Sequence, residues 1–355
     1  MGKKIKVGII GVGGISGVHI RGYQALPEDV ELYAFCDIDE KRLKEKGEKH
    51  GVTRLYTDYN EMLKLEELDA FSVCTWNSEH AGATIAALNA GKNVLCEKPM
   101  SITNEEAAAM KEAADRNGKL LQIGFVRRFG NDCKILKEFI DNGDLGDIYY
   151  AKATYLRRNG CPGGWFGDKS RSGGGPLIDL GVHVIDLVRY LIGNPKPVSV
   201  YAATFDKLKN RPDVVKNSGW RSETITEKDI FDVEDLASVM IRFETGQVLH
   251  IEASFSLNIK KGQGDIELFG TKGGAKLDPE LEIFSEWNRY MTNTQLDMST
   301  SLSFDGLFEN EIAHYVDCVK NGTKTIAPAE DGVELMKILN AAYESARTQH
   351  EVIIK

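Results

Sequence analysis

Three side chains of this sequence combine the types and spacing needed for acid–base chemistry on an alcohol: Lys98, Asp179 and His183. Histidine titrates near neutral pH, so His183 could accept the proton of a hydroxyl group. The cation of Lys98 could orient that hydroxyl and stabilise the negative charge that develops on its oxygen. Asp179 lies four residues before His183, and on a helix this spacing puts both side chains on one face. These three residues are therefore the candidate catalytic group.

The segments that carry these residues also have simpler interpretations. Glu97-Lys98-Pro99 follows an apolar run and, taken alone, matches an ordinary surface turn in which the proline sets φ. Residues 177–191 are apolar nearly all round and predict a buried helix, in which a carboxylate and an imidazole need partners or a function. The alternative for His183 is a core histidine whose hydrogen bonds are satisfied.

A second chemical feature is the segment Gly11-Val-Gly13-Gly14-Ile15-Ser16, which follows the first strand-like run and opens a predicted helix. It is typical of a dinucleotide-binding loop. The first glycine allows a tight turn, the second lets pyrophosphate approach the backbone, and the third position must be small. Ser16 keeps that small size, and the N–H groups at the helix start face the phosphates. We expect Gly11, Gly13, Gly14 and Ile15 to contact the cofactor.

The end of the second strand-like run predicts which cofactor binds. Asp37 lies 21 residues after Ser16, where an acid accepts hydrogen bonds from the adenosine ribose hydroxyls. Ile38 follows it, where an arginine would suit the 2′-phosphate of NADP. The pattern therefore favours NAD over NADP, with Asp37 and Ile38 in the cofactor site. The alternative is a glycine turn followed by an aspartate that only caps a helix.

Strand-like and helix-like segments alternate through the first 126 residues and position these motifs. Strands are predicted at 5–10, 30–36, 69–74, 93–96 and 120–125, and helices at 14–26, 40–50, 80–90 and 104–117. Such alternation predicts a parallel sheet covered on both faces. We therefore assign residues 1–126 to an NAD-binding α/β Rossmann domain.

Residues 127–355 have a different pattern. Strands are predicted at 148–156, 198–204, 237–243, 248–257 and 264–269, and helices at 133–142, 177–191, 307–320 and 329–347. Grouped strands with helices at the ends predict an α+β domain with a large, mostly antiparallel sheet. We assign substrate binding to this domain. An uncovered apolar face of that sheet would form an interface, so a homodimer or homotetramer is expected.

Composition limits the class of protein. A chain of 355 residues is too long for one ordinary core, so two domains are expected. The net charge of −9, with basic residues spread along the chain, argues against nucleic-acid binding. No apolar run approaches the ~20 residues of a membrane span, and the first residues contain no apolar signal core, so a cytoplasmic protein is expected. The six cysteines lack metal-ligand spacing; we expect buried, reduced thiols and no metal site.

Five segments together resemble one family: residues 11–16, 74–80, 97–99, 124–129 and 174–183. On these segments the chain resembles the glucose–fructose oxidoreductase and inositol dehydrogenase family, written Gfo/Idh/MocA, over essentially its whole length. The resemblance implies a Rossmann domain followed by an α+β domain whose open sheet often supports dimers and tetramers. It also implies hydride transfer between NAD and a sugar, inositol or related polyol.

The resemblance also implies roles for individual residues. Lys98, Asp179 and His183 would line the reacting centre. The cofactor contacts would include Thr75, Asn77, His80, Glu97 and Lys98. Trp76 stands where a proline is common in the family, beside the expected nicotinamide ribose.

Substrate contacts are expected from the second domain and from the loop at residues 158–175. Besides Lys98, Asp179 and His183, the candidates are Arg127, Tyr155, Arg157, Trp165 and Asp168. Trp165 is preceded by two glycines and could cover a sugar or the nicotinamide. The alternative is a surface loop that contains a packed tryptophan.

Three functional classes fit these residues, and we favour an NAD-dependent dehydrogenase or reductase acting on CH–OH groups of a small polyhydroxylated substrate. A redox-assisted glycoside hydrolase or lyase would keep NAD bound and return the hydride within each cycle. A non-catalytic ligand sensor would reuse the fold without its chemistry. Such a sensor is expected to lack the lysine or the histidine, and both are present.

Overall fold

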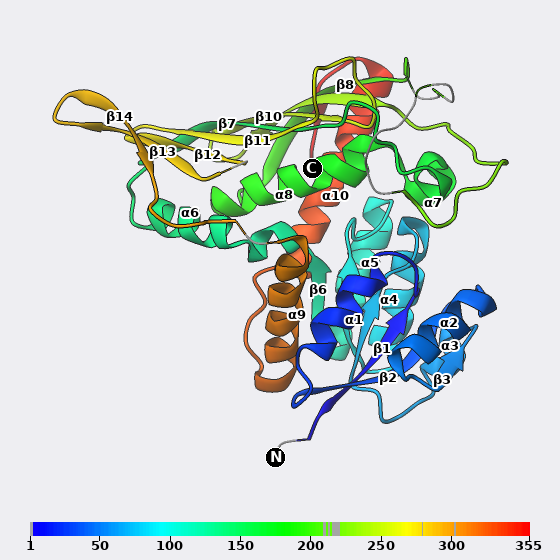
Figure 1. Ribbon diagram of the computed structural model, residues 1–355. Coiled ribbons are helices and arrows are strands. Elements are labelled where there is room, and N and C mark those ends of the chain that lie inside the picture. Colours follow the sequence, from blue (N-terminus) through cyan, green and yellow to red (C-terminus); the bar gives the residue numbers. More distant parts are fainter. Residues whose placement is uncertain (1–2, 209–210, 212–213, 215–220, 279, 302) are drawn as a thin grey trace. The chain divides into compact units, whose positions relative to one another are not determined.

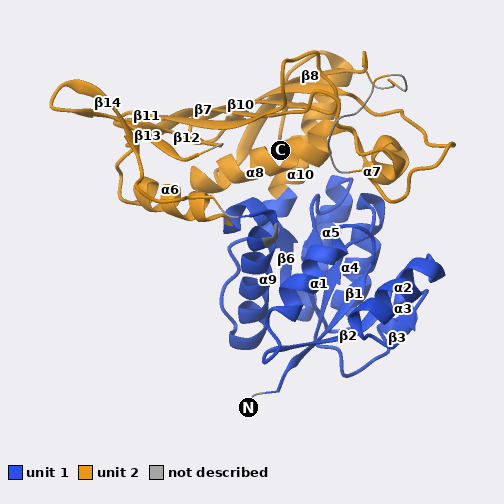
Figure 2. Cartoon of the chain, in the orientation of Figure 1, with its two compact units in different colours: residues 1–129, 303–333 blue, residues 130–302, 334–355 orange. Residues whose placement is uncertain are grey.

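The computed structural model describes residues 3–208, 211, 214, 221–278, 280–301 and 303–355. Contacts between residues divide the chain into two compact units (Figure 2). Unit 1 comprises residues 1–129 and 303–333, and unit 2 comprises residues 130–302 and 334–355. The described part of the chain contains no helix that is long and apolar enough to cross a membrane.

Unit 1 contains a six-stranded parallel sheet with helices on both faces (Figure 1). Its strand order is β3–β2–β1–β4–β5–β6, the order of doubly wound dinucleotide-binding folds. The strands are β1 (Ile5–Ile10), β2 (Val30–Cys36), β3 (Arg54–Tyr56), β4 (Ala70–Val73), β5 (Asn93–Glu97) and β6 (Leu121–Gly124). The helices are α1 (Ser16–Gln24), α2 (Glu40–His50), α3 (Tyr59–Met62), η1 (Asn77–Glu79), α4 (His80–Asn89), α5 (Asn104–Asn117), η2 (Val126–Phe129) and α9 (Phe304–Asn321).

The sequence pattern accounts for most of these elements. All four residues of β4 are buried, as expected for a central parallel strand with helices on both sides, and all but Ser72 are apolar. Helix α5 begins with a capping box between Thr103 and Glu106 and ends at Gly118, which is left-handed with φ of 58°. The short elements β3 and α3 were not predicted. Two of the three residues of β3 are only half-buried and the third is exposed, so its sequence carries no strong burial signal.

The chain returns to unit 1 at residues 303–333, whereas the sequence analysis predicted two continuous domains divided at residue 126. Helix α9 packs against α1, and its Ile312, Tyr315 and Val316 lie in the same core cluster as Ile20 and Tyr23 of α1. The apolar face of α9 is thus buried on the Rossmann sheet, far along the chain from the first 126 residues. Periodicity predicted this helix but does not say which core it covers.

Unit 2 is built on a nine-stranded mixed sheet in the order β14–β13–β12–β11–β7–β10–β9–β8–β15, and among its described residues only β7 and β10 pair in parallel. The strands are β7 (Ile148–Leu156), β8 (Pro197–Phe205), β9 (Leu236–Phe243), β10 (Val248–Ser254), β11 (Gln263–Gly270), β12 (Gly273–Leu277), β13 (Glu282–Trp287), β14 (Tyr290–Gln295) and β15 (Val352–Ile353). The helices are α6 (Asn131–Asp141), η3 (Gly164–Gly167), α7 (Lys169–Ser172), η4 (Leu177–Gly181), α8 (Val182–Leu191) and the later part of α10 (Ala329–Thr348). The predicted α+β class with a mostly antiparallel sheet is confirmed.

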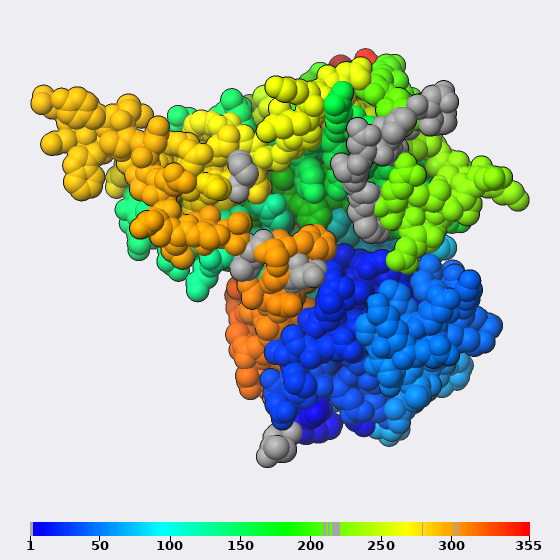
Figure 3. All heavy atoms as spheres, viewed as in Figure 1, coloured from blue at the N-terminus to red at the C-terminus, as the bar shows by residue number. Residues whose placement is uncertain are grey.

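The two faces of this sheet differ in character. One face is apolar and buried, and α8 packs against it over β7 and β10. On the other face, aligned positions of neighbouring strands carry Tyr201, Met240, His250 and Lys152. This face therefore mixes exposed apolar and polar side chains, rather than being the apolar patch that the sequence predicted. The hairpin β13–β14, which was not predicted, is drawn in yellow-orange in Figure 3. Its tip exposes Trp287, Tyr290 and Met291.

The cysteines match their prediction. All six lie within the described residues, all are buried, and none is joined in a disulfide.

Candidate active site

The predicted cofactor segments of unit 1 all follow the carboxyl ends of its parallel strands. Gly11 follows β1, Asp37 follows β2, Thr75 follows β4 and Lys98 follows β5. Parallel strands bring their carboxyl ends to one edge of the sheet, which is where doubly wound folds bind ligands. The structure therefore brings these four positions to the same edge.

The glycine loop has the geometry of a phosphate-binding turn. Gly11 has φ of +86°, and a Cβ there would lie 2.7 Å from the carbonyl oxygen of Cys74, so only glycine fits. A Cβ on Gly13 would meet no atom within 4 Å, so the backbone there is open to an approaching ligand. Ser16 is fully buried, and its hydroxyl donates to Gly13 O over 2.6 Å. These residues fit a dinucleotide cofactor, because the loop opens α1 and leaves its first N–H groups for phosphate.

Asp37 has more partners than the sequence analysis expected. One carboxylate oxygen accepts from Val12 N over 2.8 Å and the other from Asp39 N over 2.9 Å. Arg42 of α2 adds a two-point contact, with Nη2 at 2.9 Å and Nε at 3.3 Å. The sequence argument placed no arginine beside Asp37, so Arg42 is a correction to it. The signal was an arginine in the first turn of the helix that follows Asp37. Ile38 is largely exposed beside this pair.

His80 connects two loops at this sheet edge. Its Nδ1 lies 2.7 Å from Pro99 O, the shorter of its two contacts with carbonyl oxygens, and the tautomer protonated at Nδ1 donates a hydrogen bond there. Its Nε2 lies 3.3 Å from Thr75 O. Burial lowers the pKa of His80, which favours the neutral ring. His80 and Asn77 are buried, whereas Thr75 is half-buried, so Thr75 is the more accessible of the three predicted cofactor residues here.

Lys98 is half-buried between two buried neighbours, Glu97 and Pro99. One carboxylate oxygen of Glu97 accepts a hydrogen bond of 3.1 Å from the backbone N–H of Lys98. The other oxygen lies 2.7 Å from His19 Nε2. Burial acts to raise the pKa of Glu97, but the hydrogen bond from His19 and nearby positive charge lower it overall. Glu97 is therefore a carboxylate held within the protein, while Lys98 is the accessible residue of the turn.

Asp179 and His183 occupy the start of the buried helical segment in unit 2. Residues Leu177–Gly181 form a π-helical turn, η4, which continues into α8. Asp179 and His183 are half-buried, while Leu180, Gly181 and Val182 between them are buried. The two polar side chains thus lie on the accessible side of an otherwise buried segment. This favours a site residue over a core histidine for His183, and π-turns are frequent at functional sites.

Two residues that the sequence analysis missed hold the start of this segment. Glu234 accepts from Gly175 N over 2.9 Å and from Leu177 N over 3.1 Å. The hydroxyl of Tyr343 donates to Glu234 over 3.0 Å. Burial raises the pKa of Glu234. A Cβ on Gly174 would lie 1.9 Å from the Tyr343 hydroxyl oxygen, so the glycine run is required for this packing.

Three of the predicted substrate residues of unit 2, Tyr155, Arg157 and Trp165, make contacts that involve an aromatic ring. The Arg157 guanidinium lies 5.4 Å from the centre of the Tyr155 ring, and Tyr155 packs on a core cluster that includes Leu180, next to Asp179. Trp165 is half-buried and stacks on Phe166 in η3, with ring centres 3.9 Å apart.

The remaining two substrate candidates are Asp168 and Arg127. Asp168 caps α7 by accepting from Ser170 N over 3.0 Å and pairs with Arg171, so its carboxylate has a structural role. Arg127 lies in η2 of unit 1 and is half-buried.

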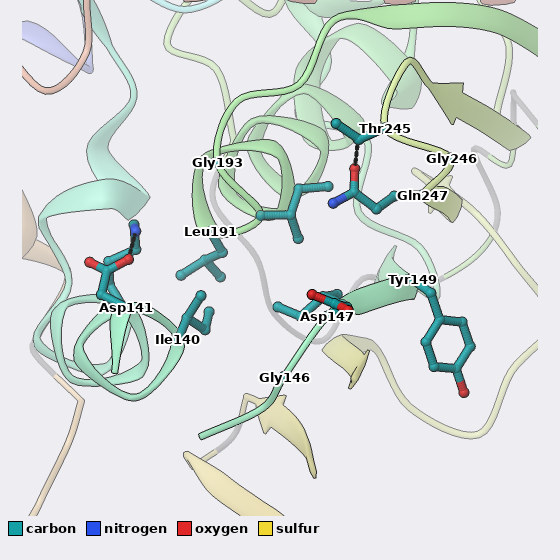
Figure 4. A pocket seen from close by; sticks show the side chains of 13 residues that line it. Ile140, Asp141, Gly146, Asp147, Tyr149, Leu191, Gly193, Thr245, Gly246 and Gln247 are labelled. Carbon is teal, nitrogen blue, oxygen red and sulfur yellow. Dashed lines mark hydrogen bonds and ion pairs between the residues drawn. The ribbon is translucent and has the colours of Figure 1, made fainter. Parts of the chain in front are cut away.

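A cavity of about 580 Å³ in unit 2 lies apart from these residues (Figure 4). Its lining includes Asp147, Tyr149, Leu191 and Gln247 and none of the predicted site residues. Four of its polar side chains pair with one another, Gln247 with Thr245 and Lys137 with Asp141. We assign it no part in the candidate site.

Comparison with known protein families identifies both parts of the chain. Residues 5–125 match the model of an oxidoreductase family with an NAD-binding Rossmann fold, and residues 137–354 match that family's C-terminal α/β domain. The chain is 34% identical to D-glucoside 3-dehydrogenase of Escherichia coli (strain K12) over 346 residues, covering 97% of this chain and 96% of that protein. It is 28% identical to myo-inositol 2-dehydrogenase of Thermotoga maritima, covering 98% of each.

Solved structures show the same fold. The structure of levoglucosan dehydrogenase in complex with NADH matches with a TM-score of 0.88 at 23% identity, covering 99% of this chain and 100% of that one. The aldose-aldose oxidoreductase of Caulobacter crescentus, crystallised with glycerol, matches with a TM-score of 0.80 at 25% identity, covering 99% and 100% of the two chains.

Proposed function

The chain belongs to the oxidoreductase family of glucose–fructose oxidoreductase and inositol dehydrogenase and is an NAD-dependent enzyme, and we propose that it transfers a hydride between nicotinamide and a hydroxyl-bearing carbon of a sugar, glycoside or inositol. The similarity to a glucoside dehydrogenase over nearly the whole chain supports this substrate class. The observation that carries the proposal is the pair Asp179 and His183, the accessible polar residues of a buried helical segment.

The catalytic roles follow from the chemistry of three side chains. NAD⁺, when bound, supplies the acceptor for the hydride that leaves the substrate carbon. His183 takes the hydroxyl proton at a ring nitrogen as the C–H electron pair departs and the carbonyl forms. Lys98 orients the reacting oxygen and stabilises its developing negative charge. Asp179 binds a neighbouring hydroxyl of the substrate, so Asp179→Ala should raise KM more than it lowers kcat.

Substrate recognition is proposed for Tyr155, Arg157, Trp165 and Arg127. Tyr155 and Trp165 offer aromatic faces for the apolar side of a sugar ring. The guanidinium of Arg157, held beside Tyr155, can donate to ring hydroxyls. In unit 1 we propose that Gly11, Gly13, Gly14 and Ile15 hold the pyrophosphate and that Asp37, Ile38, Thr75 and Asn77 line the rest of the cofactor site. His80 and Glu97 would act there through the loops that they hold.

A substrate panel tests the reaction class. Glucosides, free sugars and inositols are incubated with the enzyme and NAD⁺ at several pH values, and NADH is followed by absorbance. We expect at least one cyclic polyol to give stoichiometric NADH. Glycoside cleavage without net NADH, by an enzyme that retains NAD through gel filtration, would instead identify a redox-assisted hydrolase.

Assembly and location complete the proposal. We propose a homodimer or homotetramer formed through the uncovered face of the unit 2 sheet, where Tyr201 and Met240 are exposed on adjacent strands. Light scattering at micromolar concentration should give a multiple of the 39.3 kDa chain, and a monomer would contradict this interface. A cytoplasmic location remains a prediction from the sequence.

A further inference from the structure

A buried hydrogen-bonded chain lies behind the turn that carries Lys98. Tyr23 and His19 of α1, Ser72 of β4 and Glu97 of β5 are each at most 5% exposed. The Tyr23 hydroxyl lies 2.7 Å from Ser72 Oγ, which lies 3.1 Å from His19 Nδ1. His19 Nε2 lies 2.7 Å from Glu97 Oε1. None of these contacts belongs to the catalytic roles proposed above.

One direction of donation satisfies every member of the chain. Burial strongly raises the pKa of Tyr23, so its hydroxyl keeps its proton and can donate to Ser72. The Ser72 hydroxyl can then donate to His19 Nδ1, and the Nε2–H of His19 donates to Glu97. An ionised carboxylate only accepts, so His19 must be the donor in the last contact. The chain therefore ends on the carboxylate of Glu97.

Glu97 connects this hydrogen-bonded chain to the backbone of the turn that carries Lys98. Its second oxygen accepts the backbone N–H of Lys98. Pro99 O, on the other side of Lys98, accepts from His80. A Cβ on Gly124 of the adjacent strand would lie 3.3 Å from the Glu97 carboxylate, so a side chain there would crowd it and glycine leaves the carboxylate room in this position. Without a donor on its inner oxygen, a buried carboxylate would be costly in free energy and would favour a different rotamer.

We propose that His19 is a positioning residue for Lys98, because its Nε2–H holds the Glu97 carboxylate that in turn holds the Lys98 backbone. The inference rests on the proposed function, since it requires that Lys98 acts on the substrate. It also gives α1 two roles, because the helix that begins at the phosphate-binding loop sets the position of the catalytic turn.

A metal ion is the other occupant that this cluster suggests. His19, Glu97 and Glu311 of α9 each place a nitrogen or oxygen within 4.8 Å of the others, and all three are buried. The 2.7 Å between His19 Nε2 and Glu97 Oε1 is the length of a charge-assisted hydrogen bond. Two ligand atoms on a tetrahedral zinc lie roughly 3.3 Å apart. The geometry therefore fits a shared proton better than a cation.

The test compares two amide replacements of His19. The side-chain N–H of His19→Gln extends about as far as Nε2 and can still donate to Glu97, whereas the shorter His19→Asn cannot reach it. We expect His19→Asn to lower kcat about 10–100-fold, the scale of a misplaced catalytic group. His19→Gln should restore most of that loss. The dissociation constant for NADH, measured by fluorescence titration, should stay close to wild type in both variants. Circular dichroism and thermal midpoints report the folded fraction, to which kcat is normalised.

A control histidine and Lys98 itself complete the design. His314 of α9 lies in the same unit and bonds to Ile326 N over 3.2 Å, so His314→Asn should lower the thermal midpoint and leave kcat unchanged. Wild-type kcat in His19→Asn, or equal losses in the Gln and Asn variants, would overturn the positioning role. Stoichiometric metal in the purified enzyme that is lost in His19→Asn would overturn it as well. If Lys98→Met keeps normal kcat, the proposed function itself fails. If Lys98→Met abolishes turnover while His19→Asn does not, only the inference about His19 fails.

Discussion

Replacing Asp37 by serine should change the preference of this enzyme for NAD over NADP. In the wild-type structure the Asp37 carboxylate receives two backbone N–H groups and the two-point contact from Arg42. If ribose hydroxyls bind Asp37, they compete with Arg42 for this carboxylate. Serine removes the charge and most of the acceptor capacity, and it leaves the Arg42 guanidinium beside the cofactor site.

The size of the effect follows from two terms. One charge-assisted hydrogen bond contributes about 1.5–3 kcal/mol, so NAD should bind about 10–150-fold more weakly to Asp37→Ser. A 2′-phosphate about 5 Å from the Asp37 carboxylate would be repelled by about 3 kcal/mol at an effective dielectric constant near 20. Asp37→Ser removes that repulsion, so NADP should bind better. The ratio of the two dissociation constants should fall at least about 100-fold.

Titration calorimetry with both cofactors measures this ratio directly. Asp39→Ser is the matched control, because it removes a neighbouring carboxylate while serine still caps α2. Adding Arg42→Ala to Asp37→Ser should cancel much of the gain in NADP affinity. An unchanged ratio in Asp37→Ser, or the same change in Asp39→Ser, would refute the assignment of Asp37 as the selecting group.

Three further predictions concern catalysis and stability. Lys98→Met and His183→Ala should each lower kcat by about 10²–10⁴-fold with little change in the thermal midpoint. Single-turnover rates and melting curves measured on each variant check this prediction. A lower thermal midpoint with normal turnover in His183→Ala would show that His183 has a structural role. Arg128 pairs with Asp331 over 2.8 Å in the interior of unit 1, so Asp331→Ala should lower the free energy of unfolding by about 3–5 kcal/mol in urea titrations; a loss below ~1 kcal/mol would show that the pair is not stabilising. Because the pKa of Glu97 is lowered on folding, its contribution to stability is present above its ordinary pKa of 4.5 and is lost as pH falls through the folded value. The acid loss of stability should therefore be shallower in Glu97→Gln, and identical urea midpoints against pH for the two proteins would contradict it.

Much of the first unit could be predicted from short-range patterns. Strands β1 and β2 and helices α2 and α5 begin and end at the predicted residues, because continuous apolar runs, caps and glycines mark them locally. The glycine loop and Asp37 were recognised from their spacing. The hairpin β13–β14 was missed because its strands are half-buried or exposed along most of their length, and such strands carry little apolar signal.

The pairings within the candidate site needed the tertiary structure. Glu97 was assigned to the cofactor from the family resemblance, but its partner His19 lies 78 residues earlier in the chain. Glu234 holds a segment 57 to 59 residues earlier. In each case the partner is an ordinary residue in its own sequence context, so no local pattern indicates it.

The sequence by itself determined the type of each unit and the glycine loop at the start of α1, and it predicted Asp179 and His183 as a candidate pair, because these depend on periodicity and spacing within one segment. That both side chains are half-buried is a finding of the structure. Only the tertiary structure decided that α9 completes the core of unit 1 and that His19 holds Glu97. The physical reason is that periodicity records which face of an element is buried. Which carboxylate meets which donor depends instead on how crossover connections order the strands and on which helix covers each face.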